Sequence, residues 1–212
     1  MRGVFITFEG VEGSGKSTQA ERLALHLNQL GIDCLLSREP GGTEIGEQIR
    51  KILLDPGNST MDAHTELFLY LASRNQHVRG KVLPALSQDK VVVLDRFAAS
   101  SVAYQGGGRG LGEKLVSRLN KLATAGLRPD LTILVDVPVA VGKKRKEQLE
   151  LDRLERERVE FHERVRNSYL QMAHRAPKRI KLLDGTKPAE ALEVEIRELA
   201  EEFLRRKGIL RR

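Results

Sequence analysis

The sequence predicts an α/β fold in which a parallel sheet carries helices on both faces. Short apolar runs rich in β-branched residues recur along the chain, and most of them lack an alternation of polar and apolar residues. Strands that are buried on both faces of a parallel sheet have this pattern. Longer segments with helical spacing separate the runs, so strands and helices alternate as in doubly wound folds. The predicted strands are residues 4–8, 34–36, 91–94, 131–137 and 180–183.

Two of the predicted helices have clear apolar stripes. Residues 17–30 repeat leucine at helical spacing, at Leu23, Leu27 and Leu30. The segment after Pro188 carries apolar side chains on one face and Glu and Arg on the other. Its apolar positions are Leu192, Ile196, Leu199 and Phe203. Because no repeat or linker interrupts the pattern, we expect residues 1–212 to form one domain that binds ligands beyond the carboxyl ends of its strands.

One segment departs from this alternation. Residues 142–158 are densely charged and contain few apolar side chains, so they can bury little surface. We predict a mobile lid at about 142–158. An exposed helix without a functional role explains the same composition equally well.

The composition is that of a globular protein from a reducing compartment. Of 212 residues, 40% are apolar and 31% charged, and the single cysteine, Cys34, rules out a disulfide within the chain. No signal peptide or membrane-length apolar run is present, so we expect a cytoplasmic protein with no membrane partner. The net charge of +7 is compatible with nucleic-acid binding, but acids are interleaved with the basic residues and aromatics are few. We expect no nucleic-acid partner, because a site for several phosphate groups also uses positive charge.

The strongest motif is an unbroken G-x-x-x-x-G-K-S that follows a predicted strand and opens a predicted helix. Glycines in such a loop let backbone N–H groups point at phosphate oxygens, at the positive end of the helix. We expect Lys16 to reach the β- and γ-phosphates of a nucleoside triphosphate and the Ser17 hydroxyl to bind Mg²⁺. A glycine-rich turn with a solvent-facing lysine is the weaker alternative. The predicted ATP-binding residues are Gly10, Val11, Glu12, Gly13, Ser14, Gly15, Lys16, Ser17 and Thr18.

A second element supports this site. The run 91–94 is followed by Asp95, and a buried strand that ends in a carboxylate is the form of the element that orients Mg²⁺ beside such loops. An aspartate at a strand end is by itself more often a turn or helix cap. In combination with the glycine-rich loop, we predict that Asp95 is a metal ligand together with Ser17.

The loop is shared by switches, motors and kinases, so the reaction has to be inferred from other residues. The chain has no N-K-x-D motif of switch GTPases and lacks the further catalytic segments of larger motors. Arg38, Arg74 and Arg96 are instead candidates to hold a second, phosphate-bearing substrate, because a guanidinium fork matches two phosphate oxygens. These features indicate phosphoryl transfer to a small acceptor.

The order of motifs over nearly the whole chain resembles that of the bacterial thymidylate kinase family. The matching segments are 8–18, 38–43, Phe68 with 72–77, 95–97, 104–109 and 152–155. The resemblance implies a P-loop NTPase fold of the nucleoside monophosphate kinase type, with ATP and Mg²⁺ as cofactors. It also implies transfer from ATP to dTMP, which gives dTDP and ADP for dTTP synthesis, and a homodimer.

The resemblance further implies roles in an acceptor pocket. Phe68 resembles the residue that stacks on thymine, although the residue pattern alone would place it in the core. Arg74 resembles the donor to an exocyclic oxygen of the base. Ser101 occupies a base-contacting position with Gln105 nearby, and Tyr104 resembles the residue that closes against the sugar.

Glu12 resembles the loop acid that holds the 3′-hydroxyl of the acceptor. The loop lacks the catalytic arginine that some family members have, so the chain resembles the subgroup in which the lid supplies that cation, at Arg153. Lys146 and Arg145 are further lid cations and remain alternatives. We expect Lys16, Arg96, Arg153 and Glu12 to carry catalysis by alignment and charge neutralisation.

Two other functions stay open from the sequence. The first is a related kinase with another pyrimidine acceptor such as dUMP, since one methyl group gives limited discrimination. The second is a nucleotide-binding regulator without transfer activity.

Overall fold

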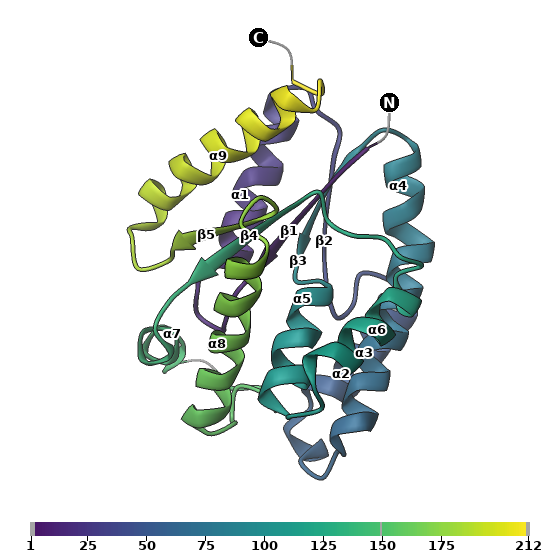
Figure 1. The fold of residues 1–212 in the computed structure, drawn as a ribbon, viewed down its shortest axis with the longest axis vertical. Helices are drawn as coiled ribbons and strands as arrows, with labels where there is room; N and C mark the ends of the chain where they lie inside the picture. Colours follow the sequence, from purple (N-terminus) through teal and green to yellow (C-terminus); the bar gives the residue numbers. More distant parts are fainter. Residues whose placement is uncertain (1–2, 149, 211–212) are drawn as a thin grey trace.

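The computed structural model describes residues 3–148 and 150–210 (Figure 1). Residues 1–2, 149 and 211–212, which belong to the predicted domain 1–212 and in one case to the predicted lid, lie outside the described residues. Five parallel strands form one sheet in the order β2-β3-β1-β4-β5. They are β1 Val4–Glu9, β2 Cys34–Arg38, β3 Val91–Asp95, β4 Leu131–Asp136 and β5 Ile180–Asp184. The predicted strands are confirmed to within two residues at each end.

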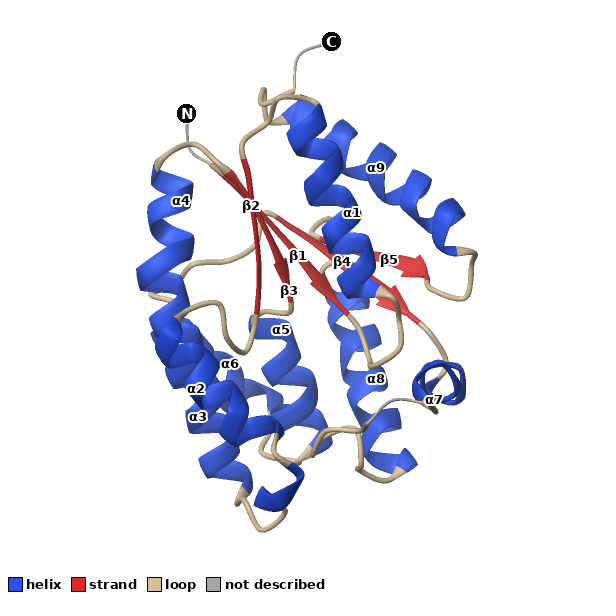
Figure 2. Cartoon of the chain, turned by 180° about the vertical axis from the view of Figure 1, so that it is seen from behind, coloured by secondary structure: helices blue, strands red, loops and turns tan. Residues whose placement is uncertain are grey.

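The helices lie in two layers around this sheet. Seen from behind, α1 lies over the sheet beside α9, and the remaining long helices lie on the opposite face or beyond the carboxyl ends of the strands (Figure 2). The α-helices are α1 Lys16–Gln29, α2 Glu44–Leu54, α3 Ala63–His77, α4 Leu83–Ser87, α5 Ala98–Ser101, α6 Glu113–Ala123, α7 Val139–Lys146, α8 Val159–Arg175 and α9 Ala189–Arg206. The other helical segments are the 3₁₀-helix η1 Pro56–Asn58 and the π-helices η2 Val78–Val82 and η3 Val102–Gly108.

The sheet is buried on both faces in its centre, as the apolar runs predicted. In β1, Val4, Ile6 and Phe8 pack against α1 and α9. Phe5 points the other way and meets the ring of Phe97 at 4.9 Å between centroids. The edge strands β2 and β5 are only partly buried. The alternating directions of strand side chains therefore give the molecule one core on each side of the sheet.

The strand order reverses at β1, which has β3 on one side and β4 on the other. In parallel α/β sheets the ligand site lies at such a reversal, beyond the carboxyl ends of the strands. The glycine-rich loop follows β1, and Asp95 ends β3, the neighbouring strand. The fold thus brings the two strongest motifs to one place.

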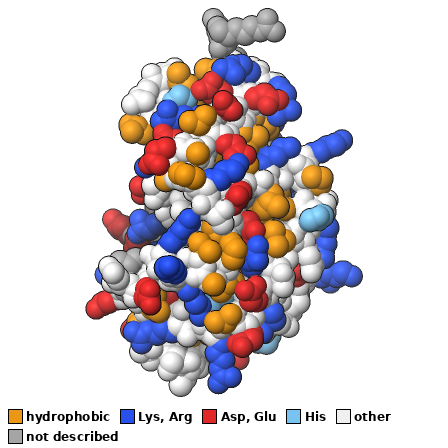
Figure 3. Space-filling view, turned by 90° about the vertical axis from the view of Figure 1, so that its left-hand side faces the viewer, with side chains coloured by type: hydrophobic (Ala, Val, Ile, Leu, Met, Phe, Trp, Pro, Cys, Tyr) orange, Lys and Arg blue, Asp and Glu red, His pale blue; other side chains and the backbone are white. Residues whose placement is uncertain are grey.

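The charged surface agrees with the interleaving seen in the sequence. On the face shown in Figure 3, Lys and Arg side chains are interspersed with Asp and Glu. Within residues 3–148 and 150–210, no helix combines the length and the apolarity that a membrane span requires.

Candidate active site

The glycine-rich loop leads from β1 into the first turn of α1. Gly15 is the N-cap of α1 with φ of 87°, a conformation that favours glycine. No acidic residue lies in the first turn of this helix, so its N-terminus is free to attract an anion. Lys16 begins the helix and its Nζ donates to Val11 O at 3.3 Å, across the loop. The geometry is that of a phosphate-binding loop.

The loop also packs directly against α7. A Cβ added at Gly13 would lie 2.2 Å from Gly142 O, and one added at Gly142 would lie 2.3 Å from Glu12 O. The two backbones therefore approach each other too closely for side chains at either position. Gly142, the first residue of the predicted lid, lies within α7 and is held against the loop.

Ser17 and Asp95 meet at the reversal point. Ser17 Oγ donates to Asp95 Oδ2 at 2.5 Å, and within the described part of the chain the buried Asp95 Oδ1 has no hydrogen-bond partner. A hydroxyl and a carboxylate with a free oxygen are hard oxygen donors of the kind that Mg²⁺ uses together with substrate phosphates. Among the described residues, no cluster of three or more His, Cys, Asp or Glu side chains could hold a metal by itself. The pair therefore fits an ion that takes its remaining ligands from water and phosphate.

Two cations lie between the loop and the rest of the pocket. Burial, together with the neighbouring Arg96, lowers the pKa of Lys16 to about 8. Arg96 has φ of 68°, a left-handed conformation unusual for a non-glycine residue, and its N–H donates to Phe8 O at 2.9 Å. This conformation directs its guanidinium to Gly10 O at 3.1 Å and to Glu12 Oε1 at 3.0 Å.

Glu12 connects the loop with the helices across the pocket. Its Oε1 accepts from Tyr104 Oη at 2.5 Å as well as from Arg96. Its Oε2 has no hydrogen-bond partner among the described residues and lies 3.7 Å from Nδ1 of His162. Burial by itself would raise the pKa of Glu12, but the charges of Arg96 and Lys16 outweigh burial and hold the pKa below its ordinary value. The residue is therefore a carboxylate with one oxygen free to accept.

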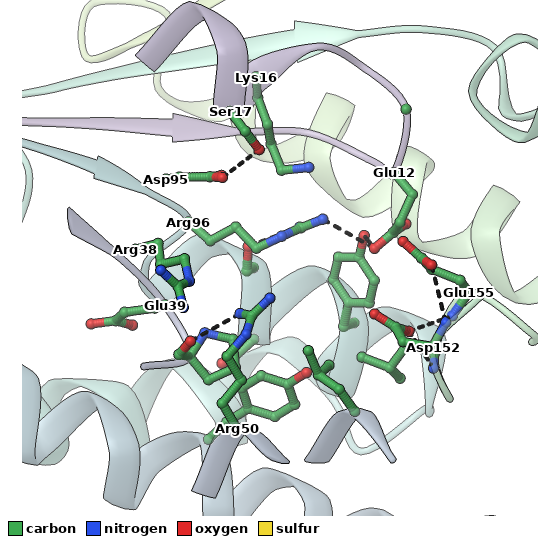
Figure 4. A pocket seen from close by; sticks show the side chains of 18 of the residues that line it. Glu12, Lys16, Ser17, Arg38, Glu39, Arg50, Asp95, Arg96, Asp152 and Glu155 are labelled. Atoms are coloured by element: carbon green, nitrogen blue, oxygen red, sulfur yellow. Dashed lines mark hydrogen bonds and ion pairs between the residues drawn. The ribbon is translucent and has the colours of Figure 1, made fainter. Parts of the chain in front are cut away.

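These groups line a cavity of about 280 Å³ (Figure 4). Arg38 and Arg50 lie at one side of it, where Arg38 pairs with Glu47 at 2.9 Å and Arg50 donates to Pro40 O at 3.0 Å. With Lys16 and Arg96 they place four cations on the walls of one pocket. Such a pocket suits a ligand with several phosphate groups.

The deep end of the pocket is a polar cluster around Arg74. This guanidinium is 1% exposed and donates to Glu39, Ser101, Asn120 and Phe97 O over 2.6 to 3.0 Å. Of its five N–H groups, these bonds leave one, on Nη2, for a ligand. Gln105 lies beside it and donates to Glu66 at 2.8 Å. Arg74, Ser101, Tyr104 and Gln105 all line the pocket together with the loop.

Phe68, which the resemblance implied at the thymine, lies outside the pocket in this structure. Phe68 is 58% exposed and does not line the pocket, whereas Tyr70 is 9% exposed and does. On a helix, Phe68 precedes Arg74 by six residues and points about 120° away from it, while Tyr70 precedes it by four and shares its face. Tyr70 and Tyr104 therefore both present aromatic rings to the pocket, and Tyr70 does so from the same helix face as Arg74.

Arg153 lies apart from the loop in this structure. It is 7% exposed, and its guanidinium pairs with Glu66 at 2.7 Å and donates to Leu53 O at 2.9 Å. The residues of the predicted lid that do line the pocket are Lys146, Asp152, Leu154 and Glu155. Lys146 pairs with Glu155 there. Arg145 binds the loop backbone at Gly13 O.

The pocket residues that the sequence interpretation missed include Tyr70 and Arg50. A signal existed for Tyr70, because the spacing of four residues to Arg74 marks one helix face. For Arg50 no local signal exists, since its place depends on how α2 packs against the sheet and α3. Glu39, which holds Arg74, lay within a quoted motif but received no role.

Comparisons with known proteins agree with this geometry. A family model described as thymidylate kinase matches residues 8–196. The chain is similar to the thymidylate kinase of Desulfosudis oleivorans, with 50% identity over 195 residues that cover 88% of this chain and 91% of that protein. It is also similar to that of Latilactobacillus sakei, with 48% identity over 196 residues, 91% of this chain and 92% of that protein. The crystal structure of thymidylate kinase from Ehrlichia chaffeensis matches with a TM-score of 0.78 and 32% identity, over 94% of this chain and 99% of that chain.

Proposed function

The chain belongs to the thymidylate kinase family, and from this premise we propose how its residues carry out the reaction. It is a nucleoside monophosphate kinase that transfers the γ-phosphoryl group of ATP to dTMP and yields dTDP and ADP. The observation that carries the assignment of its residues is the single pocket that joins the phosphate-binding loop to the polar cluster around Arg74.

For the donor, we propose that the backbone of residues 10–18 and Lys16 hold the phosphates of ATP. Mg²⁺ is proposed as the metal, with Ser17 Oγ and Asp95 as its protein ligands. Ser17 Oγ and Asp95 Oδ2 meet at 2.5 Å, and the other carboxylate oxygen, Oδ1, has no partner among the described residues. When bound, the ion supplies positive charge next to the phosphates. Replacement of Asp95 by Asn should then raise the Mg²⁺ concentration needed for half-maximal activity.

For the acceptor, the phosphate of dTMP is proposed to lie against Arg38, Arg50 and Arg96. Its base would stack on Tyr70 and receive a hydrogen bond from Arg74, with Ser101 and Gln105 beside it. Tyr104 and the free oxygen of Glu12 would face the sugar. This arrangement is supported by the position of all these side chains on the walls of one cavity.

The chemistry then needs little proton transfer. The attacking oxygen belongs to a phosphate that is largely ionised at neutral pH, so a strong general base is unnecessary. The proposed contribution of the protein is alignment of the two substrates and neutralisation of charge by Lys16 and Arg96. A lid cation would complete this set, with Arg153 as the family-based candidate and Lys146 as the one that already lines the pocket.

The other two interpretations of the sequence, another pyrimidine acceptor and a regulator without activity, are not favoured by the comparisons. A coupled assay of ADP release with MgATP tests the assignment of dTMP as acceptor. In it, dTMP, dUMP, dCMP and dGMP are supplied as acceptors in parallel reactions. Strong preference for dTMP is expected. Equal use of dCMP would contradict the base contact proposed for Arg74, since an amino group in place of the exocyclic oxygen would oppose its N–H.

We further propose a homodimer and a cytoplasmic location. Ile45 on α2 and Phe68 on α3 are 52% and 58% exposed on two helices that pack together, which supports an apolar face for a second copy. The free thiol Cys34 supports a reducing compartment. Sedimentation of the Phe68→Ser variant would test the dimer, and an unchanged dimer at low concentration would contradict this face. We also keep the proposal of one domain with a mobile lid at about 142–158.

A further inference from the structure

A second cavity lies on the face of the sheet opposite α1 and α9, behind the active-site pocket. It has a volume of about 620 Å³, within the range of small-molecule sites. Its walls come from α6, from the connection between α6 and β4, and from the C-terminal end of α8, which lie in front of the sheet in Figure 1. We refer to it as the rear cavity. The proposed reaction uses none of the space inside it.

Positive charge is concentrated around the rear cavity. Six basic side chains line it, and the acids among its lining residues are Glu9 and Glu113. Glu113 is engaged by Arg175 at 2.9 Å and by Ser168 at 2.6 Å. In the part of the chain that the structure describes, the other five basic side chains have no hydrogen bond or ion pair. They are Lys114, Arg118, Lys121, Arg128 and Arg179. Unpaired cations around one hollow suit a ligand with several negative charges.

Apolar side chains line the rear cavity together with the basic ones. Phe97, Val102 and Met172 contribute to its lining, with Leu127 and Pro129 from the α6–β4 connection. Thr7 and Thr132 add two hydroxyl groups that bond to each other at 3.0 Å. A ligand that fits this distribution has a flat, weakly polar part and a phosphate chain.

Two hydrogen-bonded links join the rear cavity to the active-site pocket. Asn120 lines the rear cavity, and its Oδ1 accepts from Nη1 of Arg74 at 2.6 Å. Glu9 also lines the rear cavity, and its Oε2 accepts from Ser100 Oγ at 2.6 Å. Arg96 in turn donates to Ser100 at 3.4 Å. Asn120 is adjacent in the chain to Lys121. A ligand that binds the cations of α6 would therefore displace this helix, and with it Asn120, one of the groups that accept hydrogen bonds from Arg74.

We propose that the rear cavity binds a small molecule of the nucleoside polyphosphate class, and that its occupancy changes acceptor binding through Asn120 and Glu9. This site is additional to the proposed nucleotide site at the phosphate-binding loop, and its existence does not depend on the activity assigned above.

Binding stoichiometry tests the site directly. Equilibrium dialysis uses the ATP analogue in which an imido group replaces the β,γ-bridging oxygen. We expect two molecules per wild-type chain and one per chain for Arg118→Glu/Lys121→Glu, whose side chains are exposed. The control Arg79→Glu/Lys178→Glu changes the net charge equally at exposed positions outside the rear cavity and should still bind two. One molecule per wild-type chain, or two per chain of Arg118→Glu/Lys121→Glu, would overturn the proposal.

Inorganic tripolyphosphate tests how much of the binding comes from the phosphate chain alone, without a nucleoside. If the flat part contributes, tripolyphosphate occupies the rear cavity more weakly than the ATP analogue does. Equal occupancy by both would overturn the nucleoside part of the proposal.

The coupling between the rear cavity and acceptor binding is tested in a variant whose phosphate-binding loop binds nucleotide more weakly. In a Lys16→Ala background, the ATP analogue should change the dissociation constant of dTMP by roughly fivefold or more. The change should vanish when Arg118→Glu/Lys121→Glu is added. An equal dissociation constant with and without the analogue in the first background would overturn the coupling.

Discussion

Tyr104 donates a hydrogen bond of 2.5 Å to Glu12 and so joins η3 to the phosphate-binding loop. The same carboxylate oxygen accepts from Arg96, whose guanidinium lies 5.1 Å from the centre of the Tyr104 ring. Three side chains from three segments thus fix one another. Glu12 accepts these hydrogen bonds at one oxygen, while its second oxygen lies 3.7 Å from Nδ1 of His162 and has room to accept from a substrate hydroxyl.

Replacement of Tyr104 by Phe tests this relationship. The ring and its contact with Arg96 remain, while Glu12 loses one of its two donors. A hydrogen bond to a charged group contributes about 1.5–3 kcal/mol, so kcat/KM for dTMP should fall between about tenfold and a hundredfold. Steady-state kinetics with each substrate varied would check it. A loss confined to ATP would contradict the proposed place of Glu12 at the acceptor.

Replacements of Tyr70 and Phe68 should affect KM for dTMP differently, although the two residues are only two positions apart. Stacking of a base on an aromatic ring contributes about 1–3 kcal/mol, so Tyr70→Ala should raise KM for dTMP by about fivefold or more. Phe68→Ala should leave KM for dTMP within about twofold, because this side chain lies outside the pocket. The reverse result in the same assay would restore the assignment made from sequence.

The difference between these two residues shows where prediction from sequence ends. A shift of two positions on an α-helix turns a side chain by about 200°, so a motif aligned slightly wrongly assigns the wrong face of α3. The glycine-rich loop does not have this problem, because its residues are contiguous and their roles follow from backbone conformation. The buried strands could also be predicted from the sequence, because strands that are covered on both faces of the sheet contain few polar residues.

Long-range partners had no signal in the sequence. Arg50 reaches the pocket because α2 packs against α3, and Arg153 is paired with Glu66, 87 residues earlier in the chain. Composition marked residues 142–158 as charged, and it contained no information on which of these charges would be buried. Part of the site therefore depends on packing that only the folded chain defines.

The contact between Gly13 and Gly142 makes a prediction about the loop. In Gly142→Ala the added methyl group would lie 2.3 Å from Glu12 O, so the loop or α7 has to move. Overpacking of this kind costs about 1–3 kcal/mol, and we expect it to appear mainly as an increase in KM for ATP of about fivefold or more. Gly80→Ala is a suitable control, because its nearest neighbour would be 3.8 Å away. Unchanged KM for ATP in Gly142→Ala would show that the loop tolerates displacement.

Glu9 predicts a pH dependence of stability. Burial raises the pKa of this carboxyl, and hydrogen bonds from Ser100 and Tyr169 oppose burial only in part. Because its pKa is higher in the folded than in the unfolded chain, its contribution to stability is complete below about pH 4.5 and is lost as pH rises through the folded pKa. The free energy of unfolding of Glu9→Gln should therefore rise relative to wild type between pH 5 and pH 8.

Urea denaturation at several pH values measures this difference, with Glu160→Gln, at an exposed position, as a charge-matched control. A constant difference between Glu9→Gln and wild type over that range would mean that Glu9 titrates alike in both states.

Within the predicted lid, we expect replacement of Arg153 to affect mainly stability and replacement of Lys146 to affect mainly catalysis. The carboxylate of Glu66 is fully buried and receives Arg153 at 2.7 Å, Arg109 at 2.9 Å and Gln105 at 2.8 Å. Removal of one partner from a buried ion pair is strongly destabilising, so Arg153→Ala should lower the free energy of unfolding by about 3 kcal/mol. Lys146→Ala should change stability by less than about 1 kcal/mol and reduce kcat, because Lys146 lines the pocket and its ion pair is partly exposed.

Urea denaturation and steady-state kinetics on the same preparations distinguish the two, with Arg156→Ala as an exposed control from the same segment. The informative combination is an Arg153→Ala protein that retains wild-type stability but loses about a hundredfold in kcat. That result would mean that Arg153 contributes little through Glu66 and acts at the transferring phosphoryl group when the lid closes. Loss of stability with normal kcat in the remaining folded protein would instead leave Lys146 and Arg145 as the lid cations that can neutralise charge in the transition state.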